Sequence, residues 1–227
     1  KSLSAKQINR KKIFLSLSDT RIKKNYNDFC NFLKIKKNFA VAVSGGPDSL
    51  ALSYLAFCYS IKMKLKCYFY VVDHKFRTGS SREADIVKSK LKKSGFNCKI
   101  LRLKKTKYRS NIQSDLRNAR YKILINECQK KGIKYLLLGH HRNDLMENFF
   151  IRLFRGSGLR GLSSFANNQT NAFKGITLIR PLLNFKKEDL VYISNKVFSF
   201  YVNDSSNKSE KFKRIRIRNF LKEFKNE

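Results

Sequence analysis

The residues best suited to chemistry stand in one glycine-rich turn, which follows an apolar run at 39–43 and precedes a helical pattern. The turn reads Ser44-Gly45-Gly46-Pro47-Asp48-Ser49. Two consecutive glycines permit positive φ angles and expose backbone N–H groups to an anion. The two serines add hydroxyl donors, and the helix that follows offers the positive end of its dipole. We therefore expect Ser44, Gly45, Gly46 and Ser49 to bind phosphate groups.

Asp48 is the exceptional residue of this turn because a carboxylate repels a polyphosphate. A cation placed between the two removes the repulsion, so Asp48 is predicted to hold Mg²⁺ against the phosphates. The turn differs from the Walker pattern, since no Gly-Lys-Ser/Thr ends it.

All three histidines follow directly on predicted strands. His74 comes after Asp73, and His140 and His141 follow an apolar run that ends in Gly139. Ligands of open α/β sheets bind at the carboxyl ends of the strands, so these residues and the turn are expected at one edge. Each histidine could equally end its strand and satisfy loop carbonyls. A zinc site is disfavoured because Cys-x-x-Cys and His-Glu-x-x-His spacings are absent.

Two carboxylates, Asp144 and Glu147, lie three residues apart and so share one helix face. Acids in a first helical turn also complement the helix dipole, which is the alternative explanation. The chain has only 16 acidic residues, and these two fall at the same predicted sheet edge as the phosphate turn. We interpret them as groups that bind a cation or accept a proton, and an amine substrate would fit them.

Apolar runs typical of strands alternate with helical patterns along most of the chain. Strands are predicted at 39–43, 66–72, 98–103 and 135–138, with a weaker one at 175–179. Helices are predicted at 49–60, 82–94, 112–131, 144–155, 186–198 and 211–224. This alternation predicts an α/β fold with a parallel sheet covered on both faces. We expect a basic helical segment at 1–36, an α/β domain at 37–183 and a small basic helical subdomain at 184–227.

The composition indicates a polyanionic partner. The chain of 227 residues has 50 Lys+Arg against 16 Asp+Glu, a formal charge of +34. Nucleic acid contacted through its phosphates is the leading expectation and a membrane surface the alternative, although compositional drift toward Lys contributes. The apolar run 13–17 is too short for a signal peptide or a membrane span, so the chain is predicted to be soluble, and our first choice is a partner other than a membrane. Five widely spaced cysteines indicate buried thiols in a reducing compartment.

The order Ser-Gly-Gly-Pro-Asp-Ser resembles the PP-loop of the N-type ATP pyrophosphatases, which cleave ATP between the α and β phosphates and form adenylates. A longer resemblance, from about 39 to 221, is to the tRNA(Ile)-lysidine synthetases. It rests on Val72-Asp73-His74, on His140-His141 with Asp144 and Glu147, and on Arg155-Gly156-Ser157-Gly158-Leu159. Departures from the family pattern are Leu145, Asn148, Ser205 and Ile215. Larger members carry a C-terminal tRNA-binding region, whereas this sequence stops at Glu227.

The resemblance implies a Rossmann-like sheet of the PP-loop ATPase type with a small C-terminal helical subdomain. It also implies ATP-dependent ligation of L-lysine to C2 of the wobble cytidine in tRNA(Ile) with a CAU anticodon, with Mg²⁺ as cofactor. Asp48, Asp144, Glu147 and His141 would then be catalytic, with His141 as a proton shuttle. Asp73 and His74 would lie near the adenosine. Phosphate and tRNA contacts would fall to Arg155, Arg160, Arg214, Arg216 and Arg218.

Two other functions stay open at this point. A PP-loop tRNA thiolase would share the ATP loop but needs a sulfur-delivering cysteine system. An RNA-binding protein that has lost catalysis is the alternative without enzyme activity. The location is expected to be the bacterial cytoplasm or a plastid-type organelle, and a homodimer is one of the forms left open.

Overall fold

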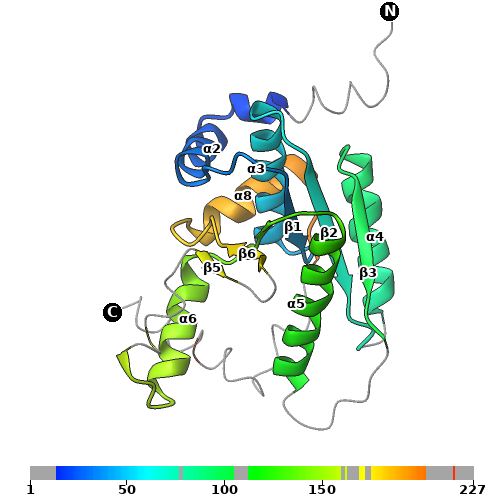
Figure 1. Cartoon of the computed structure of the whole chain (residues 1–227). Coiled ribbons are helices and arrows are strands. Elements are labelled where there is room, and N and C mark those ends of the chain that lie inside the picture. The colour runs from blue at the N-terminus through cyan, green and yellow to red at the C-terminus, as the bar shows by residue number, and fades with distance from the viewer. Residues whose placement is uncertain are drawn as a thin grey trace, which may run out of the picture.

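A six-stranded sheet forms the centre of the protein, whose computed structural model describes residues 14–76, 79–104, 112–159, 162, 169–171, 175–202 and 217. The strands are β1 (Phe39–Val43), β2 (Cys67–Asp73), β3 (Cys98–Arg102), β4 (Tyr135–Leu137), β5 (Gln169–Asn171) and β6 (Thr177–Ile179). Their order across the sheet is β3-β2-β1-β4-β6-β5. Five strands run parallel, and only β5 pairs antiparallel, at the edge (Figure 1).

The predicted strands are confirmed, and their residues explain why they form. In β1 the sequence Phe-Ala-Val-Ala-Val places Phe39, Val41 and Val43 on one face and the two alanines on the other. Both faces are therefore apolar, as a central parallel strand requires. The short polar strand β5 was not predicted, because Gln169–Asn171 has neither alternation nor apolar residues.

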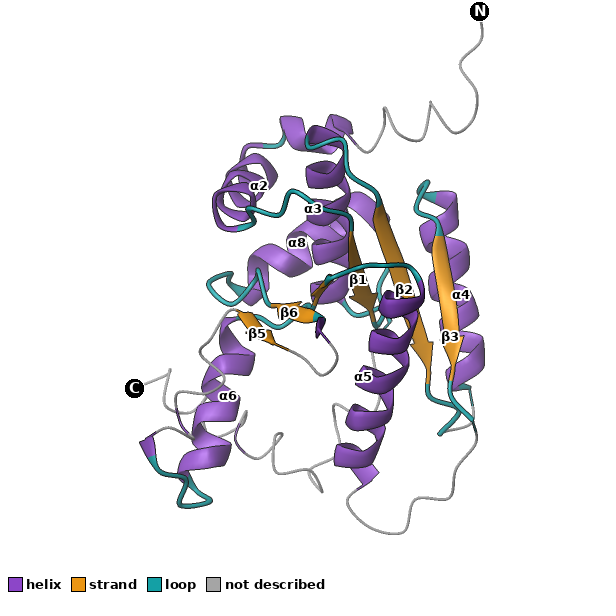
Figure 2. Cartoon of the chain, in the orientation of Figure 1, coloured by secondary structure: helices purple, strands orange, loops and turns teal. Residues whose placement is uncertain are grey.

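Helices cover both faces of the sheet, as expected (Figure 2). They are α2 (Thr20–Phe32), α3 (Pro47–Lys62), α4 (Ser80–Lys93), α5 (Ile112–Lys130), α6 (Arg142–Leu153) and α8 (Lys187–Phe198), with a 3₁₀ turn η1 at Ser16–Ser18. One core cluster joins the sheet to α2, α3, α4 and α8, and a second joins the opposite face to α5. None of the described helices is both long and apolar enough to cross a membrane.

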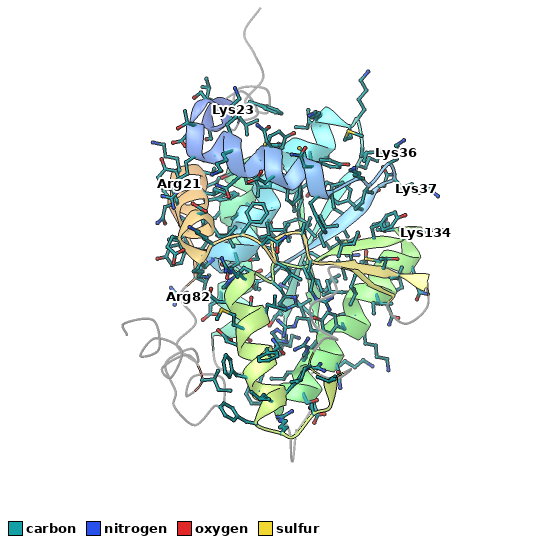
Figure 3. All side chains as sticks on the ribbon, turned by 90° about the vertical axis from the view of Figure 1, so that its left-hand side faces the viewer. Arg21, Lys23, Lys36, Lys37, Arg82 and Lys134 are labelled. Atoms are coloured by element: carbon teal, nitrogen blue, oxygen red, sulfur yellow. The ribbon has the colours of Figure 1, made fainter. Side chains whose placement is uncertain are left out.

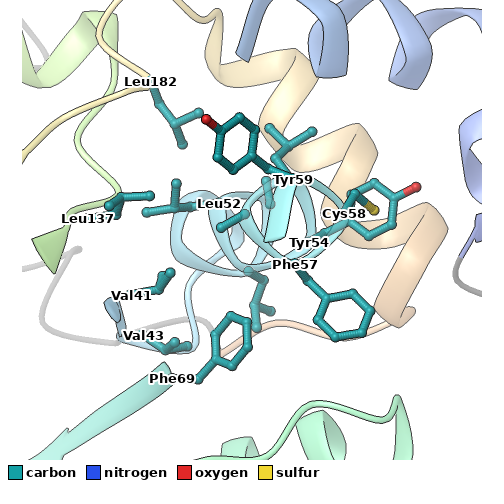
Figure 4. Close-up of a cluster of buried hydrophobic side chains, with 14 of the residues drawn as sticks. Val41, Val43, Leu52, Tyr54, Phe57, Cys58, Tyr59, Phe69, Leu137 and Leu182 are labelled. Atoms are coloured by element: carbon teal, nitrogen blue, oxygen red, sulfur yellow. The ribbon is translucent and has the colours of Figure 1, made fainter. Parts of the chain in front are cut away.

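Helix α3 is the central element of the larger core. Tyr54, Leu55 and Cys58 are fully buried, and Figure 4 shows α3 side chains packed between those of the sheet and Leu182. Burial on all sides fixes the direction in which α3 leaves β1. The turn that joins them, which holds the candidate phosphate-binding residues, is therefore rigidly placed.

Helix α8 belongs to the same core as α3, since Leu190 and Ile193 are fully buried in the shared cluster. The chain after 202 lies outside the described residues apart from residue 217, and so does the predicted helix 211–224. The division into segments 1–36, 37–183 and 184–227 therefore stays a prediction.

Candidate active site

The candidate site lies at the edge of the sheet where the parallel strands end. Four strands reach this edge: β1 leads into the turn 44–49, β2 ends at Asp73, β4 leads to 139–144, and β6 leads to Arg180. An isolated parallel bridge between His141 and Leu182 continues the pairing of β4 with β6 by a further step. The expected convergence of these segments is therefore present.

Within the turn, the hydroxyl of Ser49 is used internally. Ser49 Oγ accepts hydrogen bonds from the Ser44 amide at 3.1 Å, the Gly45 amide at 3.1 Å and Ser44 Oγ at 3.0 Å. It donates to the Gly46 carbonyl at 2.9 Å. Ser49 is buried, whereas Ser44 is exposed. The geometry thus makes Ser49 the residue that holds the turn, and phosphate contact by Ser49 stays a prediction.

Gly45 occupies a position that tolerates no side chain. Its φ is +86°, and a Cβ there would lie 2.5 Å from Cγ2 of Val87 on α4. The Gly45 carbonyl accepts a hydrogen bond of 2.9 Å from the Val202 amide, beyond the end of α8. The turn is therefore clamped from outside as well as by Ser49.

Asp48 is engaged by a residue that the sequence analysis did not single out. Lys187 Nζ lies 2.6 Å from both carboxylate oxygens of Asp48. The side chain of Lys187 is about one-third exposed and that of Asp48 is 21% exposed. Lys187 is the first residue of α8 and follows Lys186. The helix dipole disfavours two cations at a helix start, so this pair was the sequence signal that could have indicated a role for Lys187.

His141 joins two carboxylates while capping α6. Its Nδ1 accepts a hydrogen bond of 3.2 Å from the Asn143 amide, so the neutral ring carries its proton on Nε2. Nε2 lies 3.7 Å from Asp48 Oδ2 and 3.5 Å from Asp144 Oδ2. The geometry therefore favours His141 as a residue that positions both acids, and the proton-shuttle role stays a prediction.

Asp144 and Glu147 occupy the same face of α6, as their spacing predicted. Asp144 Oδ2 accepts a hydrogen bond of 3.0 Å from the His141 amide and completes the capping box. Glu147 is 3% exposed. Capping and the helix dipole therefore explain in part why an acid stands at position 144. They do not explain why Glu147, one turn further along α6, is a buried carboxylate.

Gly139 was not predicted as a site residue, yet it sets the closeness of the two halves of the site. A Cβ at Gly139 would lie 3.1 Å from Ser49 Cα and 3.2 Å from the Ser49 amide nitrogen. A side chain here would push the end of β4 and the first turn of α3 apart by a few tenths of an ångström. This close approach of the two segments places the His141 ring beside the Asp48 carboxylate.

The carboxylate of Asp73 stabilises the turn after β2. It accepts hydrogen bonds from Ser81 Oγ at 2.7 Å, the Lys75 amide at 3.0 Å and Ser80 Oγ at 3.2 Å. Burial by itself would raise the pKa of Asp73, but these donors, together with Arg102, outweigh it and hold the pKa below its usual value. His74 is half-buried beside it. Adenosine contact by Asp73 and His74 stays a prediction.

The predicted arginines are only partly described. Arg155 is exposed just beyond the end of α6, and Arg160, Arg214, Arg216 and Arg218 lie outside the described residues. Arg180, which sequence reasoning did not place in the site, is 6% exposed at the carboxyl end of β6. Burial lowers its pKa, with Arg117 adding to the effect. The buried cation of Arg180 therefore adds to the capacity of this edge of the sheet to bind anions.

Asp48 fits Mg²⁺ as one carboxylate ligand that shares the ion with substrate phosphates. Among the described residues, no three His, Cys, Asp or Glu side chains are grouped so as to hold a metal ion. Mg²⁺ is commonly held by one or two carboxylates together with substrate phosphates. Asp48 beside the phosphate turn matches that arrangement and does not match an all-protein cage.

A prominent cleft of the described chain does not coincide with these residues. It has a volume of about 930 Å³ and lies between α2 and the segment Pro181–Asp189. Its lining includes opposite charges, among them Arg21 and Asp189, which pair at 2.6 Å. Asp48, His141 and Asp144 do not line it, so the cleft and the candidate site are separate features of the surface.

A parallel α/β sheet with a Ser-Gly-Gly-Pro-Asp-Ser turn and acids at its carboxyl edge defines a phosphate-binding class of domain. The chain belongs to the PP-loop domain family, which it matches over residues 16–224. It is 41% identical over 187 residues to the tRNA(Ile)-lysidine synthase of Orientia tsutsugamushi (strain Boryong), a match covering 81% of this chain and 41% of that protein.

A second relative is the tRNA(Ile)-lysidine synthase of Wolbachia pipientis wMel, 40% identical over 185 residues, which are 81% of this chain and 42% of that protein. The chain thus spans about two fifths of these relatives. Among solved structures, the U34-tRNA thiolase NcsA from Methanococcus maripaludis, determined with its [4Fe-4S] cluster, superposes with a TM-score of 0.75 at 18% identity. That match covers 91% of this chain and 73% of NcsA, and it confirms the fold.

Proposed function

We propose that this chain ligates L-lysine to C2 of the wobble cytidine of tRNA(Ile) with a CAU anticodon, through an adenylated cytidine, giving lysidine, AMP and pyrophosphate. One observation carries the proposal. His141 Nε2 lies 3.7 Å from Asp48, in the phosphate turn, and 3.5 Å from Asp144, on the helix with the second acid. Groups suited to a nucleotide and groups suited to an amine therefore meet at one point. The similarity to tRNA(Ile)-lysidine synthases supports the same reaction.

In the first step, the turn and Asp48 receive ATP, and the C2 oxygen of cytidine attacks the α-phosphorus as pyrophosphate leaves. Bound Mg²⁺ would neutralise charge on the polyphosphate. Asp48 can take the cation only if Lys187 moves, because Lys187 Nζ lies 2.6 Å from both oxygens of Asp48. A released ammonium a few ångströms away is suited to the pyrophosphate. We propose that role for Lys187.

In the second step, the ε-amine of lysine attacks C2 and AMP leaves. A free lysine side chain has a pKa of about 10.4, so the site must bind an ammonium and also remove a proton before attack. We assign binding and deprotonation to Asp144 and Glu147, which face the same side of α6. His141 holds Asp144 in place through the capping box, while its own Nε2 lies 3.7 Å from Asp48.

The test is incorporation of radiolabelled L-lysine into unmodified tRNA(Ile) with a CAU anticodon, with ATP and Mg²⁺. Elongator methionine tRNA, which shares the anticodon, is the control. Lysine incorporated into tRNA(Ile) alone supports the proposal. Pyrophosphate release without lysine incorporation would indicate that the enzyme uses another nucleophile. If neither pyrophosphate release nor lysine incorporation is observed, the result would favour an RNA-binding protein without catalysis.

Two variants separate the steps. Asp48→Asn should abolish both pyrophosphate release and lysine incorporation, because it removes the charge that holds the cation. Glu147→Gln should keep pyrophosphate release and lose lysine incorporation, because the isosteric amide neither binds an ammonium strongly nor accepts its proton. If Glu147→Gln loses both activities while its melting temperature is unchanged, the assignment of Glu147 to the amine is wrong.

The position of the cysteines weighs against the thiolase alternative. Cys67 and Cys98 begin β2 and β3, at the edge opposite the phosphate turn. Burial raises the pKa of the Cys58, Cys98 and Cys128 thiols to about 12 and that of Cys67 well above its usual value. Protonated thiols are poor nucleophiles. We predict that iodoacetamide at pH 8 leaves lysine incorporation intact, and inactivation at the rate of thiol modification would show that a cysteine takes part in the reaction.

A further inference from the structure

The edge of the sheet opposite the candidate site is densely covered with lysine. Four segments, 33–38, 61–66, 92–97 and 130–134, lead into the adjacent strands β1, β2, β3 and β4. They contain no Asp, Glu or Arg. Their lysines, which we call the lysine edge, are all exposed: Lys34, Lys36, Lys37, Lys62, Lys64, Lys66, Lys92, Lys93, Lys130, Lys131 and Lys134.

Pairing between the strands brings these segments together. Phe39 pairs with Cys67 on one side and with Tyr135 on the other, so Lys66 and Lys134 flank the start of β1. The Phe39 amide donates to the Lys66 carbonyl at 3.2 Å. Adjacent strands lie about 4.8 Å apart, so four strand starts form a row of about 15 Å. Figure 3 shows Lys36, Lys37 and Lys134 together at this end of the molecule.

Other faces of the protein place acidic residues among their cations. Arg21 pairs with Asp189 at 2.6 Å, Lys99 with Glu127 at 2.7 Å, and Arg102 with Asp85 at 3.3 Å. The described helices α4, α5 and α8 each carry acidic residues among their cations. The unbalanced charge of the lysine edge is therefore a local feature and not only a consequence of the overall composition.

Helix dipoles account for only part of the lysine edge. Lysines in the last turns of α3, α4 and α5 complement the negative helix ends. Lys36, Lys37, Lys66 and Lys134 lie outside helices. Lys64, just after the end of α3, has a φ of 55°. The equivalent positions after α4 and α5 are the glycines Gly95 and Gly132. A lysine kept in a conformation that favours glycine is difficult to explain by stability.

We propose that the lysine edge binds the phosphate backbone of the tRNA body, as a second RNA contact separate from the catalytic edge. Lysine is a point charge that contacts phosphates without reading bases, so this contact adds affinity and no sequence preference. The seven-residue strand β2 separates the edges by about 23 Å at 3.3 Å per residue. An RNA whose anticodon loop lies at the carboxyl edge would therefore meet the lysine edge through its helical body. The choice of tRNA rests on the proposed function.

The test compares two variants of equal charge. The edge variant carries Lys36→Gln, Lys37→Gln, Lys66→Gln and Lys134→Gln. The control variant carries Lys23→Gln, Lys88→Gln, Lys122→Gln and Lys196→Gln, which are exposed on four helices. Binding of whole tRNA(Ile) and of its isolated anticodon stem-loop is measured over a range of salt concentrations. Melting temperatures verify folding, and the four Lys→Arg changes at the edge should restore binding.

We expect the edge variant to lose whole-tRNA affinity tenfold or more. Its plot of log affinity against log salt should be less steep by about 0.7–0.9 per lost phosphate contact, while stem-loop binding is unchanged. Equal losses in the control variant would show that only total charge matters, and loss of stem-loop binding would place the contact in the catalytic RNA site. Two tRNA molecules bound per chain would also overturn the proposal. If no protein incorporates lysine but the edge variant alone loses tRNA affinity, the proposed reaction fails and the RNA contact stands.

Discussion

At the scale of single residues, Gly139 decides whether the two halves of the site can meet. A Cβ would press on backbone atoms of Ser49 at 3.1 and 3.2 Å, and backbone cannot swing aside as a side chain can. Gly139→Ala should therefore separate His141 from Asp48 by a few tenths of an ångström and lower kcat by about 10- to 100-fold. The cost in stability should stay within about 1–3 kcal/mol. Steady-state kinetics with a thermal melt test this, and full activity would contradict it.

Asp73 makes the stability of the fold depend on pH. Its folded pKa lies below that of the unfolded chain, about 3.9, so the unfolded state takes up the proton more readily as the pH falls. Asp73 therefore stabilises the fold above about pH 4, and this contribution is lost below it. Asp73→Asn should cost about 1–3 kcal/mol at neutral pH and flatten the acid limb of the stability curve. Urea unfolding at pH 3 to 7 measures both effects, and parallel curves for the two proteins would refute them.

At the scale of elements, the C-terminus of α3 differs from its neighbours. The Lys64 amide donates to the Ile61 carbonyl and the Leu65 amide to the Ser60 carbonyl, the same pattern that Gly95 and Gly132 make at the ends of α4 and α5. An L-residue in this left-handed conformation costs about 1 kcal/mol relative to glycine.

Lys64→Gly should therefore stabilise the protein by up to about 1 kcal/mol, because it relieves this strain. Under the RNA proposal the same change should weaken tRNA binding slightly, since it removes one cation. Chemical denaturation gives the stability difference. A destabilised variant would mean that Lys64 makes a contact that outweighs the strain.

The elements were largely predictable because the sheet is central and apolar. β1 was predicted with its observed bounds, since alternating Phe39 to Val43 has no competing pattern. Helix α6 was predicted from Asp144, two residues late, because His141 is an unusual N-cap and its role depends on the Asn143 amide. The contact of Lys187 with Asp48 joins residues far apart in sequence and depends on how α8 packs on α3. Local patterns hold no information on such a contact.

At the scale of the whole molecule, the two edges of the sheet differ in the residues that accompany their positive charge. The carboxyl edge combines its cations with Asp48, Asp144 and Glu147, whereas the opposite edge carries lysine alone. Under the two proposals, the tRNA would meet a selective surface at one end and an unselective one at the other. Binding through many phosphates makes RNA affinity depend steeply on salt, since each contact releases counterions.

The last prediction concerns this dependence on salt. With a formal charge of +34, the apparent KM for tRNA(Ile) should rise at least tenfold between 50 and 200 mM salt, while kcat changes little. The KM for lysine, which we propose Asp144 and Glu147 bind, should change much less, because short-range contacts in a partly buried site are weakly screened. Steady-state kinetics with each substrate varied in turn measure the difference. A KM for tRNA that does not respond to salt would show that the positive charge of the chain does not serve RNA binding.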